Sequence, residues 1–545
     1  MSDRSLAARA RAYSETLVGW PSVTGTPDEA QFPHRLAELI GGWDYFRDSP
    51  QDLVVQPIEG DPNGRSNVIA LVRGTGSRTV ILSGHFDVVP VDDYTDLAPL
   101  AGKPQELTAA LIARLEAQGG YPQALDDLKS GAFLPGRGML DMKSGVAAGM
   151  AVLQAFSEQA ERKGNLLLVA TPDEEENSCG MRGAATFLPR FLRDRGLDVP
   201  LAINLDATCD PDEGQNGRVV TMGTIGKLLL SAFVVGKDSH ACYPFDGVNA
   251  AYLAAELAVE FEGSPDLGEV TNGEIASPPT ALSSKDGKSV YNVTTPGRAW
   301  LFWNVLIHNR TPADILAIAR RKAEEAVARA GRRMTERAAG LDPSIPVNPF
   351  WQSIRVLTFA ELRAIAEQQP GFGEAFAREA TRLAKDVSLD VPTRSRVLTE
   401  FTVHRSGLEG AAVILGNASM PYPAIKWQPT NANRATEAAI EAGMAEIAAR
   451  ENLSIEKRAF FPAISDMSFL GPQDVSGLED TAANTPLWGS SINWDLAGEA
   501  AAIPIINIGP WGRDYHHWLE RTHIDYTFRV LPELVQAVAH RVLKA

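Results

Sequence analysis

Continuous apolar runs recur along the chain, and several of them end in polar or charged segments. Residues 79–82 and 166–170 form two such runs, and residues 200–205 and 503–508 form two more. Runs of this length without polar alternation are typical of strands that are buried on both faces of a largely parallel sheet. Because open α/β sheets bind their ligands at the carboxyl ends of the strands, the pattern predicts one polar site at that edge.

A different order of elements begins near residue 219. The pattern predicts a strand at 227–235, a helix at 248–261, a hairpin of strands at 289–294 and 299–307, and a helix at 313–339. A strand, a helix, two strands and a helix form a two-layer α+β unit of ferredoxin type. We therefore expect a smaller, ferredoxin-like domain inserted into the first domain.

The length of 545 residues exceeds what one hydrophobic core usually supports, so two domains are expected. The predicted division is a catalytic domain at 1–218, the inserted domain at 219–340, and the second part of the catalytic domain at 341–545. Helical spacing is expected over about 5–45 and in a helical insert within about 341–400, and an apolar strand at 411–415 then returns to the first domain. The predicted fold class is α/β, with a mixed, mostly parallel sheet flanked by helices.

A polar, irregular segment at about 91–135 interrupts the first domain. It includes a short amphipathic piece at 107–118, and it is too long for a simple connection between two elements. We expect this insert to shape the rim of the site.

Charge and cysteine content narrow the choice of partners. The formal net charge of -17 argues against a nucleic-acid partner and against an anionic membrane surface. The amino terminus lacks a basic segment followed by an apolar stretch, and no apolar run approaches the roughly 20 residues of a membrane span. The three cysteines are an odd number without a C-x-x-C pair, which suits a reducing compartment. We expect a cytoplasmic protein without a nucleic-acid or membrane partner.

The first run is followed by side chains that bind metals. His85 and Asp87 lie two positions apart, so on a strand both face the same side. His85 can then bind a metal while Asp87 accepts the other ring N–H, and the alternative is a strand-end ion pair. Asp141 follows a glycine-rich turn and opens a helix, where it can cap the helix or bridge two cations roughly 3.5–4 Å apart.

The second run leads to neighbouring acidic residues. Glu174 and Glu175 point in opposite directions if the segment is extended, so one can bind metal while the other reaches a water molecule. Glu176 leaves this register open by one residue, and a solvated acidic loop is the alternative.

The third and fourth runs lead to further candidates. Asp206 ends the third run and adds an anionic oxygen. His516 and His517 follow the fourth run, and at most one of them is expected to bind metal.

Taken in their order along the chain, these segments resemble the M20 family of metallopeptidases and amidohydrolases. The resemblance rests on S-G-H-F-D-V-V-P at 83–90, on G-R-G-M-L-D-M-K at 136–143 and on T-P-D-E-E at 171–175. The long insert after His85, the segment beginning F-L-P at 133 and the segment G-P-W-G-R-D-Y-H at 509–516 resemble in particular the RocB-type branch of arginine-utilisation proteins.

The resemblance implies a zinc-peptidase-like catalytic domain that binds two divalent metal ions, with Zn²⁺ expected and Mn²⁺ or Co²⁺ as alternatives. Carried over by motif, His85 and Asp206 bind one ion, Glu175 and His516 bind the other, and Asp141 bridges them.

One choice within this set follows from the resemblance as well. His516 is preferred to His517 because Glu520 lies four residues after it, the spacing expected of the family's terminal His and Glu. Asp87 is also counted among the expected catalytic residues, because its place two positions after His85 lets its carboxylate fix the orientation of that ring.

The resemblance also implies residues that act on the substrate. Glu174 is the expected general base, which removes a proton from a metal-bridging water so that the hydroxide attacks an amide carbonyl. The inserted domain is expected to be a lid and dimerisation domain, in which His240 stabilises the oxyanion, often in the site of a dimer partner. Asn292 and Arg310 are expected to bind the carboxylate of the substrate.

The leading hypothesis is therefore a dinuclear-metal-dependent hydrolase that cleaves an amide C–N bond of a small N-acyl amino acid or peptide-like substrate with a free carboxylate. An alternative is a metal-dependent deaminase or a ureido- or guanidino-type hydrolase in amino-acid catabolism. A further alternative is a non-catalytic metal-binding scaffold, against which Glu174 argues because a purely structural site needs no base.

Overall fold

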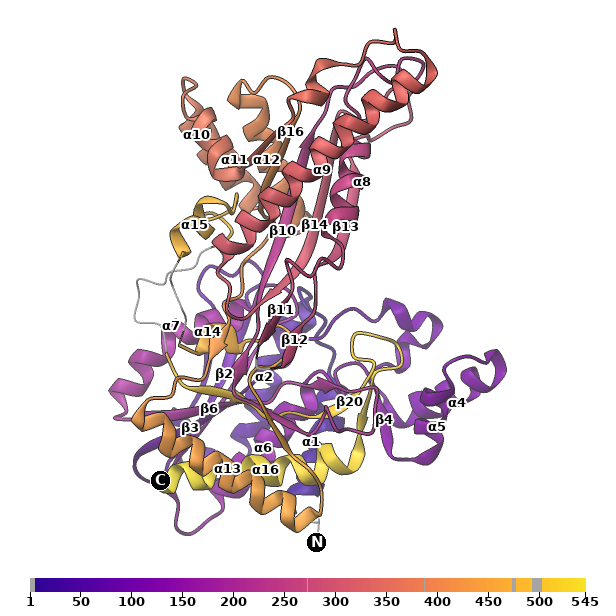
Figure 1. Ribbon diagram of the computed structural model, residues 1–545. Coiled ribbons are helices and arrows are strands. Elements are labelled where there is room, and N and C mark those ends of the chain that lie inside the picture. The colour runs from indigo at the N-terminus through magenta and orange to yellow at the C-terminus, as the bar shows by residue number, and fades with distance from the viewer. Residues whose placement is uncertain (1–4, 272, 387, 473–476, 493–501) are drawn as a thin grey trace. The chain divides into compact units, whose positions relative to one another are not determined.

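The computed structural model of the chain describes residues 5–271, 273–386, 388–472, 477–492 and 502–545. The chain forms two compact units, and Figure 1 shows their elements. Unit 1 comprises Met1–Thr224, Ile425–Gln473 and Ala497–Ala545, and unit 2 comprises Ile225–Ala424 and Asp474–Leu496. The chain therefore leaves unit 1 twice to build unit 2.

Unit 1 is built on a large mixed sheet. Its strands are β1 (Leu53–Pro57), β2 (Ser66–Val72), β3 (Thr75–His85), β5 (Lys163–Thr171), β6 (Asp198–Asn204), β8 (Val219–Thr221), β18 (Glu456–Arg458) and β19 (Ile505–Asn507). Among the described residues, their order across the sheet is β1-β2-β5-β3-β6-β19-β8-β18. The central strands β5, β3, β6 and β19 run parallel to one another, whereas β1, β2 and β8 make antiparallel pairs. The predicted mixed, mostly parallel sheet is confirmed.

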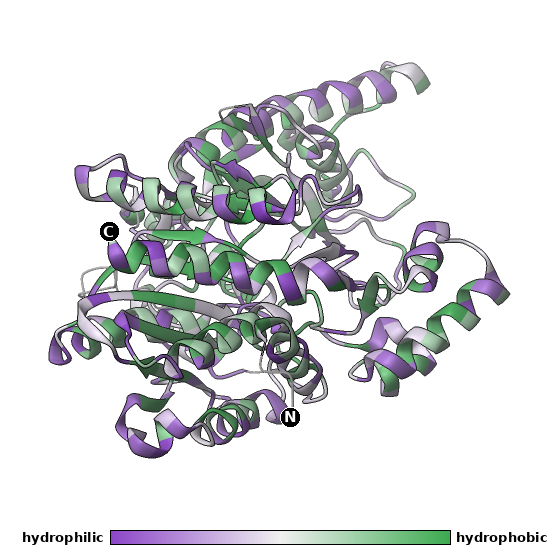
Figure 2. Cartoon of the chain, turned by 90° about the horizontal axis from the view of Figure 1, so that it is seen from below, coloured by the Kyte–Doolittle hydropathy of each residue, from purple (hydrophilic) through white to green (hydrophobic). Residues whose placement is uncertain are grey.

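The apolar runs are buried on both faces of this sheet. Val80 and Leu82 belong to the core cluster that also contains the apolar residues of α6 (Lys143–Ser157). Ile81 lies between them and is also fully buried. Because neighbouring side chains of a strand point to opposite faces, both faces of β3 are covered. Figure 2 shows strands that are largely hydrophobic, whereas hydrophobic and hydrophilic residues alternate along the helices.

Helices cover the sheet of unit 1. Besides α6, they are α1 (Leu6–Val18), α2 (Pro27–Gly41), α3 (Asp44–Asp48), α7 (Cys179–Asp194), α13 (Asn431–Glu451), α14 (Met467–Leu470) and α16 (Leu531–Lys544). The helices predicted over about 5–45 are confirmed by α1, α2 and α3. α6 comes very close to the end of β6, because a Cβ at Gly145 would lie 2.1 Å from the carbonyl oxygen of Leu205. This glycine therefore lets the start of α6 approach the edge of the sheet.

The insert predicted at about 91–135 is helical and not irregular. It contains the 3-10 segment η2 (Asp92–Leu100), α4 (Pro104–Gln118) and α5 (Pro122–Ser130), and α4 includes the predicted amphipathic piece. These elements share a small core of their own, which includes Tyr94, Leu111, Leu128 and Leu519. The apolar residues of the insert face this local core, so they form only short, interrupted helical patterns along the chain.

The insert leads into a second, smaller sheet of unit 1. Its order among the described residues is β4-β21-β20-β7, with β4 (Phe133–Pro135), β7 (Thr208–Cys209), β20 (Trp511–Arg513) and β21 (Arg521–His523). β9 (Gly223–Thr224) and β17 (Ile425–Lys426) form an antiparallel pair at the point where the chain leaves and re-enters unit 1.

Unit 2 contains a sheet with the order β13-β14-β10-β16-β15 among the described residues. Its strands are β10 (Gly226–Val235), β13 (Thr280–Asp286), β14 (Arg298–Ile307), β15 (Arg355–Thr358) and β16 (Ala412–Asn417), and a short hairpin is formed by β11 (Glu269–Thr271) and β12 (Glu274–Ala276). Its helices are α8 (Ala250–Phe261), α9 (Pro312–Leu341), α10 (Phe359–Ala366), α11 (Phe372–Ala384), α12 (Val391–Ser406) and α15 (Leu478–Ala483). Apart from the β11–β12 hairpin between α8 and β13, the elements β10, α8, β13, β14 and α9 occur in the predicted strand-helix-strand-strand-helix order.

The predicted strand at 289–294 is wrong. The strand that forms the hairpin with β14 is β13, which begins nine residues earlier, at Thr280, and places Asp286 opposite Ala299. β13 is an exposed edge strand, so its sequence has little of the apolar alternation that marks a half-buried strand. The segment at 289–294 instead lies beside another loop, where the amide of Ala241 donates to the carbonyl oxygen of Val293.

The strand predicted at 411–415 does not return to the first domain. It is β16, which pairs antiparallel with β10 and parallel with β15 inside unit 2. Residues 341–424 therefore lie in unit 2 and not in the second part of the catalytic domain, and the expected end of the inserted domain at 340 is too early. An apolar run that is buried on both faces shows that a strand is present, but the run does not show which sheet the strand joins.

No helix in the described ranges combines the length and the apolar character that crossing a membrane requires.

Candidate metal centre

The carboxyl ends of the central strands of unit 1 bring the predicted ligands together. His85 is the last residue of β3, Glu174 and Glu175 follow β5, and Asp206 follows β6. Asp141 precedes α6, and His516 lies in the loop between β20 and β21. These segments are distant in sequence, and the parallel order of the strands places their ends at one edge.

Asp141 lies between the two histidines. Its Oδ1 is 3.2 Å from His85 Nε2, and its Oδ2 is 3.3 Å from His516 Nε2. His516 Nε2 is also 3.0 Å from Glu175 Oε2. Possible ligand atoms of His85, Asp141 and Glu175 all lie within 4.8 Å of one another, so these residues form a candidate metal site.

Two further carboxylates approach His85. Its Nε2 lies 3.7 Å from Glu174 Oε2 and 4.0 Å from Asp206 Oδ1. Glu174 therefore lies beside one histidine and Glu175 beside the other, while Glu176 is exposed. His517 points elsewhere, because its ring packs near Tyr121. The geometry favours the predicted register and His516 over His517.

Asp87 holds this edge of the sheet together. The Nδ1 atom of His85 is 3.1 Å from the backbone oxygen of Asp87 and 3.4 Å from its Oδ1. The Asp87 carboxylate also accepts from the backbone amides of Glu174 and Glu175, at 3.1 and 3.2 Å, and from the hydroxyl of Thr24 at 2.8 Å. Asp87 thus orients the ring of His85 and fixes the backbone that carries both glutamates.

A left-handed turn at Asp173, with φ of 68°, lets both glutamates face the cluster. The Asp173 carboxylate accepts from Arg65 Nη1 at 2.5 Å and from the amide of Cys179 at 2.9 Å. Arg65 is buried and also contacts Asp61 at 2.8 Å and Glu29 at 3.4 Å. Sequence reasoning missed this support, because Arg65 follows a turn and carries no motif of its own.

Glu520 and Arg137 support Asp141. The Glu520 carboxylate accepts from the amides of Leu140 and Asp141 at 3.1 and 3.2 Å, and from Arg137 Nη1 at 2.8 Å. Arg137 also binds Asp93 in the insert, at 2.9 Å. Burial raises the pKa of Glu520 to about 7, although the charge of Arg137 opposes this effect.

Asp466 is a buried carboxylate near the cluster that sequence reasoning also missed. It accepts from the hydroxyl of Thr171 at 2.7 Å, and burial raises its pKa to about 6. The neighbouring Ser465 accepts from Asn204 at 2.9 Å. No apolar strand leads directly into this segment, so the strand-end pattern that identified the other ligands gave no signal here.

The cluster carries more negative than positive charge. Burial raises the pKa of Glu174 well above its usual value and also raises that of Glu175. Burial, together with the charge of Asp141, raises the pKa of Asp206 to about 7. Burial lowers the pKa of His516, but hydrogen bonds with Asp141 and Glu175 outweigh it and raise the pKa to about 11.

This donor set fits divalent cations. The acidic members of the cluster are Asp87, Asp141, Glu174, Glu175 and Asp206, and only two imidazoles accompany these five carboxylates. One carboxylate oxygen of Glu174 and one of Glu175 are buried without a hydrogen-bond partner in the described structure. Buried carboxylates at this density are stable when cations neutralise them, and oxygen and imidazole donors suit Zn²⁺, Mn²⁺ and Co²⁺.

The candidates of unit 2 lie in two places. His240 is exposed, its Nδ1 accepts from the amide of Cys242, and its backbone forms a bridge with Thr294. The Asn292 side chain accepts from the hydroxyl of Thr294 at 2.6 Å, so it lies near the same loop pair.

Arg310 is separate from His240 and Asn292 and donates to the carbonyl oxygens of Asp266 and Gly268. The substrate-directed roles of these three residues stay predictions.

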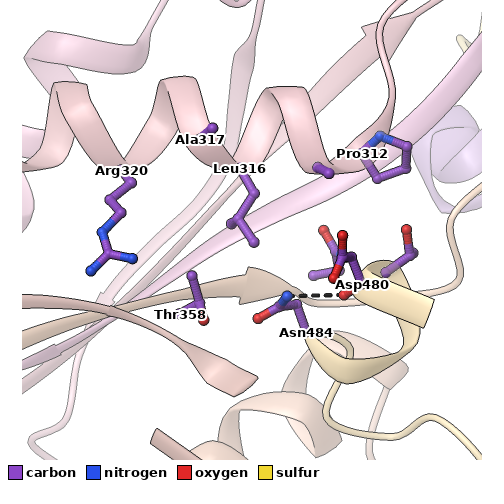
Figure 3. A pocket seen from close by; sticks show the side chains of 10 residues that line it. Pro312, Leu316, Ala317, Arg320, Thr358, Asp480 and Asn484 are labelled. Carbon is purple, nitrogen blue, oxygen red and sulfur yellow. Dashed lines mark hydrogen bonds between the residues drawn. The ribbon is translucent and has the colours of Figure 1, made fainter. Parts of the chain in front are cut away.

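Unit 2 also contains a cavity of about 250 Å³, shown in Figure 3. Leu316 and Pro312 of α9 form part of its apolar lining, and Asp480 of α15 and Asn484, which follows α15, lie opposite them. The Asn484 side chain is already engaged, because its Nδ2 donates to the carbonyl oxygen of Asp480. Within the described ranges, the cavity lining has no histidine or cysteine and only one carboxylate, so the centre in unit 1 is the stronger candidate for chemistry.

Comparison with known sequences gives matches over most of the chain. Residues 81–482 match the sequence profile of peptidase family M20/M25/M40. YqjN of Bacillus subtilis is 30% identical over 544 residues, which cover 98% of this chain and 96% of YqjN. RocB of the same organism is 28% identical over 560 residues, which cover 100% and 97%. A succinyl-diaminopimelate desuccinylase of Nitratiruptor sp. is 26% identical over 299 residues, which cover 54% of this chain and 67% of that protein.

Solved structures with a similar fold include a dipeptidase and a carboxypeptidase. The dipeptidase Dug1p of Saccharomyces cerevisiae has a TM-score of 0.55 at 10% identity, with 100% of both chains covered. The M20 family metallo-carboxypeptidase Sso-CP2 of Sulfolobus solfataricus has a TM-score of 0.52 at 12% identity, with 98% of this chain and 99% of that chain covered. At these identities the likeness concerns the fold.

Proposed function

The chain belongs to peptidase family M20/M25/M40, and from this premise we propose that it cleaves an amide C–N bond of a small N-acyl amino acid or peptide-like substrate with a free carboxylate. One observation carries the proposal: the two oxygens of Asp141 face two histidines, at 3.2 and 3.3 Å. A carboxylate that only capped a helix would not need to lie between two imidazoles.

In the proposed site, His85 and Asp206 hold one divalent ion, Glu175 and His516 hold the other, and Asp141 serves both. We propose Zn²⁺, with Mn²⁺ or Co²⁺ as alternatives. When bound, such a pair of ions polarises the substrate carbonyl and makes water more acidic. The hydrogen bonds of Asp87 support this assignment, because they hold the ring of His85 and the backbone of both glutamates.

Glu174 is the proposed general base. Its Oε1 is buried and has no hydrogen-bond partner in the described structure, so this atom is available for a proton. Burial raises the pKa of Glu174 well above its usual value, which suits a group that takes a proton from water and later passes it to the leaving nitrogen. Removal of such a base typically costs about 10²–10⁴-fold in rate.

The substrate is proposed from its chemistry. The name of the desuccinylase relative describes removal of a succinyl group from an amino acid derivative, which supports an N-acyl amino acid as the substrate class. Asn292 and Arg310 are proposed to bind the substrate carboxylate, and His240 is proposed to stabilise the oxyanion.

A homodimer through unit 2 and a cytoplasmic location complete the proposal. The strand β13 is an exposed edge of the unit 2 sheet and carries Leu282, which is 58% exposed, so it offers backbone and apolar surface to a second copy. The three cysteines are all free thiols, which suits a reducing compartment.

The test is turnover by the zinc-loaded chain on three groups of compounds. The first group contains N-acyl amino acids and dipeptides, and the second contains carbamoyl and guanidino acids. The third contains amino acids whose free amine a deaminase would remove. Hydrolysis in the first group is expected. Turnover only in the second or third group would replace the proposal with the ureido-type hydrolase or the deaminase.

The matched variants are Glu174→Gln and Glu176→Gln, which make the same change at a buried and an exposed position. Glu174→Gln is expected to keep its metal content and to lose about 10³-fold in kcat, whereas Glu176→Gln should keep both. Unchanged turnover in Glu174→Gln would remove Glu174 from its assigned role.

A further inference from the structure

The loop that carries His516 has an unusual backbone. Asp514 and His516 have φ values of 56° and 60°, in the left-handed region that side chains other than glycine rarely adopt. Residues in this region are strained, and they persist only where the surrounding structure holds them. The loop therefore depends on contacts outside itself.

Two arginines lie at the base of this loop. Arg513 on β20 and Arg521 on β21 are directly opposite each other in the antiparallel pair. Both side chains are almost completely buried, with exposed fractions of 4% and 1%. Like charges directly opposite each other destabilise a strand pair, and a buried charge without a partner is more costly still. The two guanidinium groups therefore need a shared anion.

Asp127 of α5 in the insert is that anion. Its carboxylate accepts from Arg513 Nη1 at 2.6 and 2.7 Å, and from Arg521 Nε at 2.8 Å. The only other acidic side chain within ion-pair distance of Arg513 in the described structure is Glu213, at 3.5 Å, and it is 90% exposed. Asp127 is therefore the buried counter-charge for the pair.

Arg521 links Asp127 to the loop. Its Nη1 donates to the Asp514 carboxylate at 2.5 Å and to the carbonyl oxygen of Leu519 at 3.0 Å. Asp514 and Leu519 lie on either side of His516 in the sequence. A continuous series of charge-assisted hydrogen bonds thus runs from α5 to both ends of the segment that presents His516.

We propose that Asp127 is a positioning residue, which fixes the 514–520 loop through Arg513 and Arg521 and so sets the orientation of His516. The inference rests on the proposed function, in which His516 holds a metal ion. The insert is then part of the support of the metal centre, in addition to any role at its rim.

The test is Zn²⁺ binding to the full chain, measured by competition with a chelator in the absence of substrate. Asp127→Asn keeps the size of the side chain and removes the shared anion. We expect one of the two ions to bind about 10–100-fold more weakly, as is typical when a group that orients a metal ligand is lost. The visible spectrum of the Co²⁺-loaded chain should change as well, because it reports the geometry of the ligands.

Asp126→Asn is the matched control, since Asp126 is the exposed neighbour on the same helix. It should leave both affinities and the Co²⁺ spectrum unchanged. An equal loss in Asp126→Asn would mean that charge near the centre is responsible, and it would overturn the role of Asp127.

A double variant separates positioning from stability. Asp127→Asn with Arg513→Gln removes one of the two opposed charges, so thermal stability is expected to recover, while the weaker ion affinity persists. If Asp127→Asn alone does not fold, the ion affinity of the double variant provides the same test. Wild-type affinity for both ions in either folded variant would overturn the inference.

The result also distinguishes this inference from the proposed function. A wild-type chain that binds two ions but hydrolyses none of the substrate classes counts against the proposed function alone, and the Asp127 comparison stands. A wild-type chain that binds no divalent ion overturns both.

Discussion

Unit 1 and unit 2 use acidic side chains in opposite ways. At the centre in unit 1, burial raises the pKa of Asp206 to about 7 with help from the charge of Asp141, and burial raises the pKa of Glu520 to about 7. Burial would raise the pKa of Glu256 on α8 of unit 2, but hydrogen bonds with Tyr252, Arg333 and Arg329 outweigh burial and lower it. Ionised acidic side chains are therefore electrostatically unfavourable at the centre of unit 1, whereas in unit 2 they stabilise the fold.

The difference lies in where the partners are. The carboxylates of unit 2 face arginines and lysines on the neighbouring helix α9, and Glu260 binds Lys322 at 3.0 Å and Arg329 at 2.8 Å. At the centre of unit 1, five carboxylates share two histidines, so several of them face one another across the ends of the strands. Cations from solution are therefore expected to matter for unit 1 and to leave unit 2 unaffected.

Metal loading should give the largest difference between the units. Saturating Zn²⁺ at 1,000 times its dissociation constant adds about 4 kcal/mol per site to the free energy of unfolding. Amide hydrogen exchange should slow in β3 and β5, while β10 and β14 keep their rates. Equal slowing in both units would contradict the comparison.

Acidification of the metal-free chain should have the next largest effect on stability. It should stabilise unit 1 and destabilise unit 2. Glu520 and Asp206 have raised pKa values in the folded state, so the stability they contribute is fully present below their unfolded values near 4 and is lost as the pH rises through about 7. The change for unit 1 is on the order of 3–4 kcal/mol for each of these two groups.

The lowered pKa values of Glu256 and Glu260 act in the other direction. Their contribution is present above about pH 4.5 and is lost as the pH falls below that value. Hydrogen exchange at pH 4, 5.5 and 8 in the presence of a chelator measures both trends. A single trend shared by β3 and β10 would be incompatible with this assignment.

The effect of Asp206→Asn on the free energy of unfolding should change sign when Zn²⁺ is added. At pH 8 in chelator, the neutral amide relieves the repulsion with Asp141, so the free energy of unfolding is expected to rise by about 1 kcal/mol, as happens when strained functional groups are replaced. The gain from Zn²⁺ should shrink at the same time. Urea unfolding with and without Zn²⁺ measures both effects.

Asp210→Asn is the matched control for this variant. The Asp210 carboxylate accepts from three backbone amides, those of Asp212, Asn216 and Gly217. Its replacement should lower stability by about 1–2 kcal/mol, with the response to Zn²⁺ retained. If both variants destabilise the metal-free chain equally, repulsion at Asp206 is refuted.

Glu256→Gln should give the smallest effect. It weakens two arginine contacts of a nearly covered carboxylate, so the free energy of unfolding is expected to fall by about 0.5 kcal/mol, equally with and without Zn²⁺. Glu374→Gln is the control, because its carboxylate is 87% exposed and 3.7 Å from Arg378, and its effect should be close to zero. A dependence of the Glu256 effect on Zn²⁺ would link unit 2 to the centre and break the comparison.

Much of the candidate centre could be predicted because its residues follow strongly apolar strands. The runs before His85, Glu174 and Asp206 are buried on both faces, and strand ends of this kind carry the ligands of parallel sheets. The predicted family and the resemblance to the RocB-type branch are confirmed by the matching profile and by relatives that span the whole chain.

The rest depends on contacts that sequence periodicity does not encode. Arg65 lies before the apolar strand β2 and not at its carboxyl end, and no apolar strand leads directly into Asp466, so only the folded chain reveals them. β13 was missed because an exposed edge strand has little apolar alternation, and β16 was assigned to the wrong sheet because burial on both faces does not identify a strand's neighbours. Pairing partners are set by the competition among all strands, and that competition is not local.

The position of β19 in the sheet has a consequence for the order in which the protein is made. β19 lies between β6 and β8, although it begins only at Ile505, and His516 follows it. The strands of unit 2 in the part of the chain that the structure describes lie between Gly226 and Asn417, so they leave the ribosome while the sheet of unit 1 still lacks a central strand. A nascent or prematurely terminated chain would therefore expose two unpaired strand edges in unit 1, which are surfaces prone to aggregation and to capture by chaperones.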